Sequence, residues 1–135
     1  MMTARETALI TLKKCIKSGQ YSNIALDNAL TKSDLEAHDR ALAAALFYGV
    51  IEKKITLDYY ISRLSSRPLC EIDEDILMII RLGIYQLAFL DRIPDHAAIN
   101  ETVSLAVSKK RGFVNAVLRS YLREKEKNRA SRRQD

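Results

Sequence analysis

The sequence predicts an all-α fold, a bundle of about seven helices. Apolar residues recur at intervals of three and four along most of the 135 residues, which is the spacing of one face of an α-helix. No segment shows the strict alternation of apolar and polar residues that indicates a half-buried strand. Only two prolines and four glycines interrupt the chain, so little in it breaks a helix. A chain of this length is expected to form one domain with its own hydrophobic core.

Four helices are predicted in the first half of the chain, over residues 4–18, 23–31, 34–51 and 57–65. Each follows a residue whose side chain caps helices, namely Thr3, Ser22, Ser33 and Thr56. Thr3 and Ser33 each have a glutamate three residues later, which is the capping-box pattern. Gly19 is expected to end the first helix. The third contains ALAAALFYGVI, which is apolar almost all round, so we expect this helix to be central.

Three helices are predicted in the second half, over residues 73–90, 96–109 and 113–127. The first of them contains ILMIIRLGIYQLAFL and is the second central helix. Gly83 lies in its interior, where a glycine costs about 1 kcal/mol, so we expect a neighbouring helix to approach closely there. Asp95 is expected to cap the next helix. Residues 128–135 contain one apolar residue and are predicted to be disordered.

Arg81 is the main charged interruption of the second central helix. A buried guanidinium needs a partner, because an unpaired charge away from water is costly. Asp39 and Glu101 are the candidates for the carboxylate. The predicted role of Arg81 is therefore structural.

Positive charge is concentrated at the C-terminal end. The net charge is +5, of which residues 119–135 contribute +4 and residues 1–118 only +1. A uniformly basic surface is therefore not predicted, whereas a basic stripe or tail is.

Sequence patterns of catalysis and of membrane insertion are absent. No apolar run reaches 18 residues, and the N-terminus lacks the order of a signal peptide. Cys15 and Cys70 form no CxxC pattern and are expected to fill the core of a reduced, cytoplasmic protein. His38 and His96 are expected at helix starts as surface or capping residues. Metal-binding patterns, nucleophile motifs and glycine-rich phosphate loops are missing, so we expect no catalysis, cofactor or metal in this chain alone.

The segment KKRGFVNAVLRSYLR at 109–123 raises the question of function. Its apolar residues form one helical face, and Asn115 lies on the flank of that face in register with Arg119 and Arg123, while Arg111 precedes it. In one interpretation, Asn115 ties the helix to a neighbour and the arginines are a solvated surface. In the other, amide and guanidinium groups bind RNA phosphates and bases. The pattern alone leaves both interpretations open.

A second basic set lies on the first predicted helix. Arg5 is in line with the apolar stripe, so it is expected either to pair with an acidic residue or to reach a phosphate. Lys13, Lys14 and Lys17 are expected to face solvent.

Four segments together resemble the NusB family. They are DRALxxxLxYGV at 39–50, RLGxYQL at 81–87, DRIPDHAAINE at 91–101 and RGFVNAVLR at 111–119. The resemblance covers roughly residues 4–123 and implies an all-α RNA-binding domain of about seven helices. Two branches of the family differ in function. NusB proper is a transcription antitermination factor that binds the boxA element of ribosomal RNA together with a small-subunit ribosomal protein. The other branch is the N-terminal domain of RsmB-type 16S rRNA cytosine-C5 methyltransferases.

The segments PDHAAINE and GFVNAVLR resemble the RsmB branch more closely. Gly112 and Ala116 differ from the residues of the corresponding sequence motif in NusB proper, and only Arg5 is present where that branch has an arginine-rich N-terminus. The resemblance implies a separate catalytic domain with S-adenosylmethionine and two cysteines in Pro-Cys and Thr-Cys settings, which neither Cys15 nor Cys70 matches. Residues 1–123 are then the NusB-like RNA-binding domain, and residues 124–135 a basic, disordered tail or the start of a linker to a methyltransferase domain that this chain lacks.

The resemblance favours RNA binding by the basic residues. The predicted RNA-binding residues are Arg5, Lys13, Lys14, Lys109, Lys110, Arg111, Asn115, Arg119 and Arg123. The expected partners are ribosomal RNA and either the chain's own C-terminal methyltransferase domain or a ribosomal protein, with no membrane. Two alternatives remain, a NusB antitermination factor and a protein-docking helical module without direct RNA contact.

Overall fold

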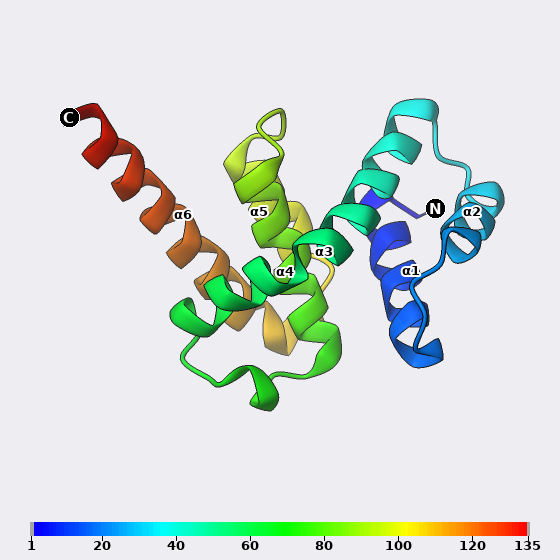
Figure 1. Ribbon diagram of the computed structural model, residues 1–135, viewed down its shortest axis with the longest axis horizontal. Helices are drawn as coiled ribbons and strands as arrows, with labels where there is room; N and C mark the ends of the chain where they lie inside the picture. Colours follow the sequence, from blue (N-terminus) through cyan, green and yellow to red (C-terminus); the bar gives the residue numbers. More distant parts are fainter. Residues whose placement is uncertain (1, 135) are drawn as a thin grey trace. The chain divides into compact units, whose positions relative to one another are not determined.

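The computed structural model describes residues 2–134, with side chains described as far as residue 131, and this part of the chain is all-α (Figure 1). It contains six α-helices and two short 3₁₀ turns. The backbone forms two compact units, one ending at Lys54 and the other beginning at Ile55. No helix in the described part is long and apolar enough to cross a membrane.

The first unit contains α1 (Ala4–Ser18), α2 (Asn23–Lys32) and the beginning of α3 (Ala37–Leu64). The predicted start of α1 is confirmed, because the N–H of Glu6 donates to Thr3 Oγ1 at 3.1 Å and the N–H of Thr3 donates to Glu6 Oε1 at 3.2 Å. The predicted end is confirmed as well, since Gly19 adopts a left-handed conformation with φ of 76°. Figure 1 shows α1 and α2 side by side.

The core of this unit is built from one stripe of each helix. Its largest fully buried side chains are Leu12, Leu26, Leu46 and Phe47. The third predicted helix was expected to be buried on almost all sides, and this expectation is only partly met. Tyr48 is exposed, and its hydroxyl donates to Asn23 Oδ1 at 3.0 Å.

The helices predicted over 34–51 and 57–65 are one continuous helix, α3. The predicted cap Thr56 is therefore wrong, because it lies exposed inside α3. The intervening EKKI contains neither proline nor glycine, so nothing in it stops the helix. The predicted capping box at Ser33 is also wrong. Ser33 ends α2 instead, with its hydroxyl donating to the carbonyl of Leu30 at 2.8 Å.

The second unit contains the end of α3 together with η1 (Leu69–Glu71), α4 (Glu74–Phe89), α5 (Asp95–Val103), η2 (Ser108–Lys110) and α6 (Arg111–Gln134). The central position of α4 is confirmed, because it packs against both α5 and α6 and buries most of its residues. One buried polar contact joins α4 to α5. Gln86 Nε2 donates to Thr102 Oγ1 and to the carbonyl of Leu82, both at 2.9 Å.

Gly83 marks the point where α6 meets α4. A β-carbon added at Gly83 would lie 2.6 Å and 2.7 Å from the two terminal methyl carbons of Leu118. Leu118 is completely buried. The predicted close approach at Gly83 is therefore confirmed, and its partner is a leucine side chain.

Arg81 is buried and paired, as predicted, but neither predicted carboxylate is its partner. Its Nε donates to Asp58 Oδ1 at 2.7 Å and its Nη2 to Asp58 Oδ2 at 3.1 Å. Asp58 lies on the last part of α3, within the second unit. A bidentate pair of this kind fixes orientation as well as distance.

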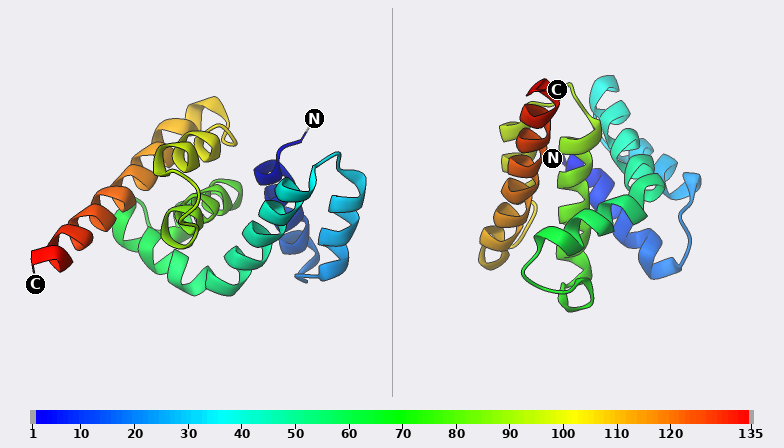
Figure 2. Two further views of the ribbon diagram at one scale, coloured as in Figure 1. Left: turned by 90° about the horizontal axis from the view of Figure 1, so that it is seen from above. Right: turned by 60° about the vertical axis from the view of Figure 1, so that its left-hand side comes forward.

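The last two predicted helices have different bounds in the structure. The helix predicted over 96–109 ends at Val103, and η2 follows before α6. The predicted cap at Asp95 is wrong, because Pro94 occupies the capping position, Asp95 lies in the first turn of α5, and no side-chain cap bond is formed. The predicted disorder of 128–135, and of the tail 124–135 as a whole, is wrong as far as Gln134, because α6 continues that far, and Asp135 lies outside the described residues. Figure 2 shows α6 continuing as a helix toward the C-terminal end. Residues 124–130 are mostly Glu, Lys, Arg and Ala, which are good helix formers.

Candidate nucleic-acid interface

The first four turns of α6 separate a buried face from a basic face. Val114, Val117 and Leu118 are buried. At 100° per residue, the opposite face carries a set of exposed residues that consists of Gly112, Ala116, Arg119 and Arg123. We call this set the outer face of α6. Asn115 is half-buried between the two faces, as its spacing predicted.

The outer face combines two cations with two very small residues. No ion pair is found for Arg119 among the residues whose side chains are described, and Arg123 donates from Nη2 to Ser120 Oγ at 3.0 Å. Nothing lies within 4 Å of a β-carbon built at Gly112. A ligand can therefore approach the helix backbone closely at Gly112 and Ala116 while the guanidinium groups reach over it.

Arg111 has a structural task that its position in the sequence did not reveal. Its Nε donates to the carbonyl of Ala106 at 2.9 Å and its Nη2 to the carbonyl of Ser104 at 3.2 Å. These two bonds hold the segment between α5 and α6. A guanidinium has five N–H donors, so three remain for a ligand.

Lys109 and Lys110 lie in η2, immediately before α6. Lys109 is exposed and Lys110 half-buried. Lys110 shares a small hollow with Arg67 and Phe113, and the Arg67 guanidinium lies 5.7 Å from the centre of the Phe113 ring. Arg67 thus adds a cation to this end of α6. Sequence reasoning missed it because it comes from the loop after α3.

Arg5, Lys13 and Lys14 lie on α1, in the first unit. Arg5 and Lys13 are half-buried, and Lys14 is exposed. The structure therefore brings together six of the nine predicted residues, those in η2 and α6. The three on α1 form a separate group.

The histidines and cysteines form no site within the described residues. His38 is exposed, with its Nε2 3.3 Å from Asp39 Oδ1. No group of three metal-ligating side chains is found in this part of the chain. Cys15 is buried as predicted, but Cys70 is exposed, because it lies in the short η1 turn and not in a helix face.

Lys125 is a further residue that sequence reasoning missed. Its Nζ donates to the carbonyl of Leu87, in the last turn of α4, at 2.6 Å, and to Asp95 Oδ1 at 3.3 Å. An ammonium at the carbonyl end of a helix is favourable because of the helix dipole. Lys125 therefore anchors the second half of α6 to α4 and α5, and its side chain is half-buried.

The all-α fold and the sequence together define the class of protein. The NusB family profile matches residues 2–123, and the chain belongs to this family.

The curated relatives are longer proteins. The chain is 38% identical over 132 residues to a probable ribosomal RNA small subunit methyltransferase B of Synechocystis, covering 93% of this chain and 29% of the relative. It is 37% identical over 128 residues to the probable protein of that name from Bacillus subtilis, covering 90% and 28%. It is 36% identical over 127 residues to ribosomal RNA small subunit methyltransferase B of Escherichia coli, covering 90% and 29%. The chain thus spans less than a third of the length of these relatives, and it matches their N-terminal part.

Proposed function

We propose that this chain is the RNA-binding domain of an RsmB-type rRNA (cytosine-C5) methyltransferase and positions 16S rRNA for a separate catalytic domain. The observation that carries the proposal is the outer face of α6, with Arg119 and Arg123 exposed beside Gly112 and Ala116. The names of the relatives support the choice of ribosomal RNA. The family resemblance supports an N-terminal, non-catalytic role.

The proposed chemistry is recognition of the RNA backbone. The arginines of the outer face offer bidentate donors to phosphate oxygens, and Lys109 and Lys110 extend the positive charge toward the start of α6. Asn115 offers an amide at the rim, within reach of a base edge or a ribose hydroxyl. The small residues Gly112 and Ala116 leave room for the backbone of a loop or single strand. Arg5, Lys13 and Lys14 are proposed as further RNA contacts on α1, with Arg5 and Lys14 on opposite sides of that helix at 100° per residue.

S-adenosylmethionine is assigned to the separate catalytic domain. In this proposal, the chain's own task is to hold RNA. Residues 124–134 would then lead, as a continuation of α6, toward the rest of the protein.

The test is RNA binding across a salt series, with a 16S rRNA hairpin fragment and a boxA RNA as probes. Binding is expected to weaken with the logarithm of salt concentration, by a slope of about −0.7 for each phosphate contact. The Arg119→Ala/Arg123→Ala variant is expected to make that slope shallower by about 1.4, because two contacts are lost. Lys54→Ala/Arg92→Ala is the matched control, because it also removes two exposed cations.

The outcomes separate the alternatives. A preference for the hairpin supports the methyltransferase assignment, and a preference for boxA supports antitermination. Absence of binding at low salt would leave a protein-docking module. The salt dependence of RNA binding could also become equally shallow in the Arg119→Ala/Arg123→Ala variant and in the control variant. That result would show that only net charge matters and that the outer face of α6 is not the RNA contact.

A further inference from the structure

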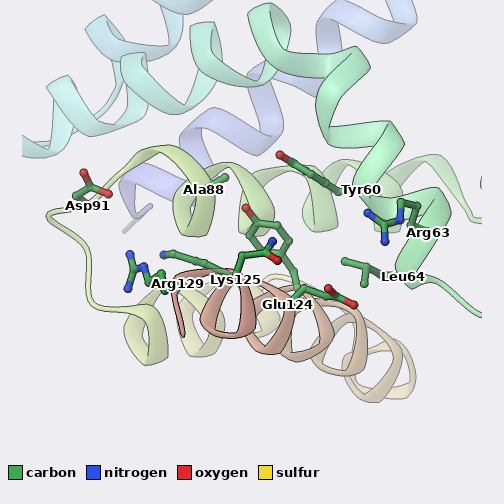
Figure 3. Close-up of a pocket in the computed structure, with 10 residues that line it drawn as sticks. Tyr60, Arg63, Leu64, Ala88, Asp91, Glu124, Lys125 and Arg129 are labelled. Atoms are coloured by element: carbon green, nitrogen blue, oxygen red, sulfur yellow. The ribbon is translucent and has the colours of Figure 1, made fainter. Parts of the chain in front are cut away.

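A cavity of about 350 Å³ lies in the second unit, between the end of α3, the end of α4 and the second half of α6 (Figure 3). Small-molecule sites range from roughly 300 to 1,000 Å³, so this cavity suits a ligand at the small end of that range. None of the predicted RNA-binding residues lines it. The cavity is also separate from the outer face of α6, because at 100° per residue its α6 residues lie on the other side of that helix; they are Tyr121, Glu124, Lys125, Asn128 and Arg129.

The walls of the cavity contain two aromatic rings. Tyr60 of α3 and Tyr121 of α6 have ring centres 5.2 Å apart at an interplanar angle of 48°. Both side chains are half-buried, so each presents apolar surface to the cavity without being sealed in the core. Stacking on tyrosine is a common way to hold an unpaired base and requires no particular base sequence.

The cavity also has a cation at each end. Figure 3 shows Arg63 of α3 at one end and Arg129 of α6 at the other, with Tyr60 and Lys125 between them. Lys125 is engaged by Leu87 and Asp95, which leaves the two arginines as the groups for a ligand. Both arginines are exposed, and no ion pair is found for either among the residues whose side chains are described. The Arg63 guanidinium lies over the ring of Tyr59, 5.8 Å from its centre, which leaves its N–H groups for a ligand. A guanidinium at the mouth of a cavity suits a phosphate.

The remaining polar groups favour a base that carries an amino group. Asp91 and Glu124 line the cavity as hydrogen-bond acceptors. Burial, followed by the neighbouring Tyr60 and Asp95, raises the pKa of Tyr121 to about 12, so its hydroxyl is a donor at neutral pH. A cytosine ring has an amino donor for a carboxylate and a ring nitrogen and carbonyl that accept from a hydroxyl. Uracil has no amino group and offers only one ring N–H in place of the two amino hydrogens, so it can donate to no more than one of the two carboxylates.

We propose that this cavity binds a single unpaired nucleotide, with its base against Tyr60 and Tyr121 and its phosphate at Arg63 or Arg129. The preferred bases are those that carry an amino group, cytosine in particular. This inference extends the proposed function, since the nucleotide would be a looped-out residue of the bound RNA. The cavity itself is tested with free nucleotides.

The experiment measures equilibrium binding of cytidine 5′-monophosphate, uridine 5′-monophosphate and cytidine by NMR titration of the full chain. We expect cytidine monophosphate to bind at least five-fold more tightly than uridine monophosphate. Tyr60→Ala is expected to weaken its binding at least ten-fold, because base stacking on an aromatic ring is lost. Tyr21→Ala is the matched control, because it removes an exposed tyrosine that does not line the cavity.

A second pair of variants tests the phosphate contact. Arg63→Gln and Arg129→Gln keep a long polar side chain, and we expect at least one of them to weaken binding of the monophosphate several-fold while leaving that of cytidine unchanged. Both lie on the surface, so unfolding is not expected. Equal binding of the three compounds, or no binding at millimolar concentration, overturns the inference.

The same variants separate this inference from the proposed function. If the hairpin RNA binds, but Tyr60→Ala binds it as the unchanged chain does and no free nucleotide binds, the cavity inference is wrong and the proposed function stands. If cytidine monophosphate binds in the cavity but no RNA binds at low salt, the proposed function is wrong and the cavity is a site for free nucleotides.

Discussion

The pair formed by Arg81 and Asp58 makes a quantitative prediction about stability. The Arg81 side chain is only 8% exposed and the Asp58 side chain 23%, and two charged hydrogen bonds join them. Removing one partner of a fully buried pair costs about 3–5 kcal/mol, because the other charge stays buried without compensation. Since Asp58 is partly accessible to water, we expect Asp58→Ala to lower the free energy of unfolding by about 2–3 kcal/mol.

The isosteric variant separates charge from shape. Asp58→Asn keeps the size of the side chain and one acceptor oxygen, so we expect a loss of about 1–2 kcal/mol. Replacing both residues by apolar ones, as in Asp58→Leu/Arg81→Met, is expected to cost less than Asp58→Ala alone, because no unpaired charge is left. This ordering of the three variants is the signature of a desolvated pair.

The assay is urea unfolding followed by circular dichroism, with the slope against urea concentration compared among variants. Asp27→Ala is the control, because Asp27 is an exposed acidic residue in the interior of α2. We expect it to change stability by no more than about 0.5 kcal/mol. A loss below about 0.5 kcal/mol for Asp58→Ala would refute the reasoning, since the pair would then behave as a surface ion pair.

Three further predictions concern a close contact, a cap and a titration. Gly83→Ala is expected to destabilise the protein by about 1–2 kcal/mol, because the new methyl group meets Leu118. Gly112→Ala has open space around the new methyl group and should be neutral or stabilising by up to about 1 kcal/mol. Equal urea midpoints for the two variants would contradict this reasoning. Thr3→Ala is expected to lose about 1 kcal/mol through the capping box of α1, measured in the same way, and an unchanged midpoint would show that the first turn frays in the unchanged protein. The pKa of Tyr121 is raised from 10.0 to about 12 in the folded protein, so the unfolded chain loses the phenolic proton at a lower pH than the folded protein does. The stability that comes from this difference in pKa should therefore be complete below about pH 10 and lost between about pH 10 and 12. Ultraviolet absorbance of the phenolate, compared with Tyr121→Phe, measures this titration, and a normal titration of Tyr121 near pH 10 would contradict it.

Local sequence rules were most successful where a feature depends on neighbours along the chain. The capping box at Thr3 and the left-handed Gly19 both follow from contacts within four residues. The position of Asn115 between two faces of α6 follows from helical periodicity alone. The motif pattern also led to the family, which the profile match over residues 2–123 shows.

The same rules failed where two local signals compete. Ser33 matches a helix start, yet it ends α2, because its hydroxyl can bond to a carbonyl behind it as readily as to an N–H ahead. Thr56 matches a cap, yet the helix formers before it continue α3. Capping residues do not specify on which side of them the helix lies.

The sequence by itself determined the helical content, the central place of α4 in its unit and the basic flank of α6. Only the tertiary structure decided that Arg81 pairs with Asp58, that Arg111 holds the segment before α6, and that a cavity forms beside Tyr60. Helical periodicity is a property of one segment and is visible in its residues. The partner of a side chain, and the space between three helices, depend on how helices far apart in the chain cross, and that is set by the packing of the whole core.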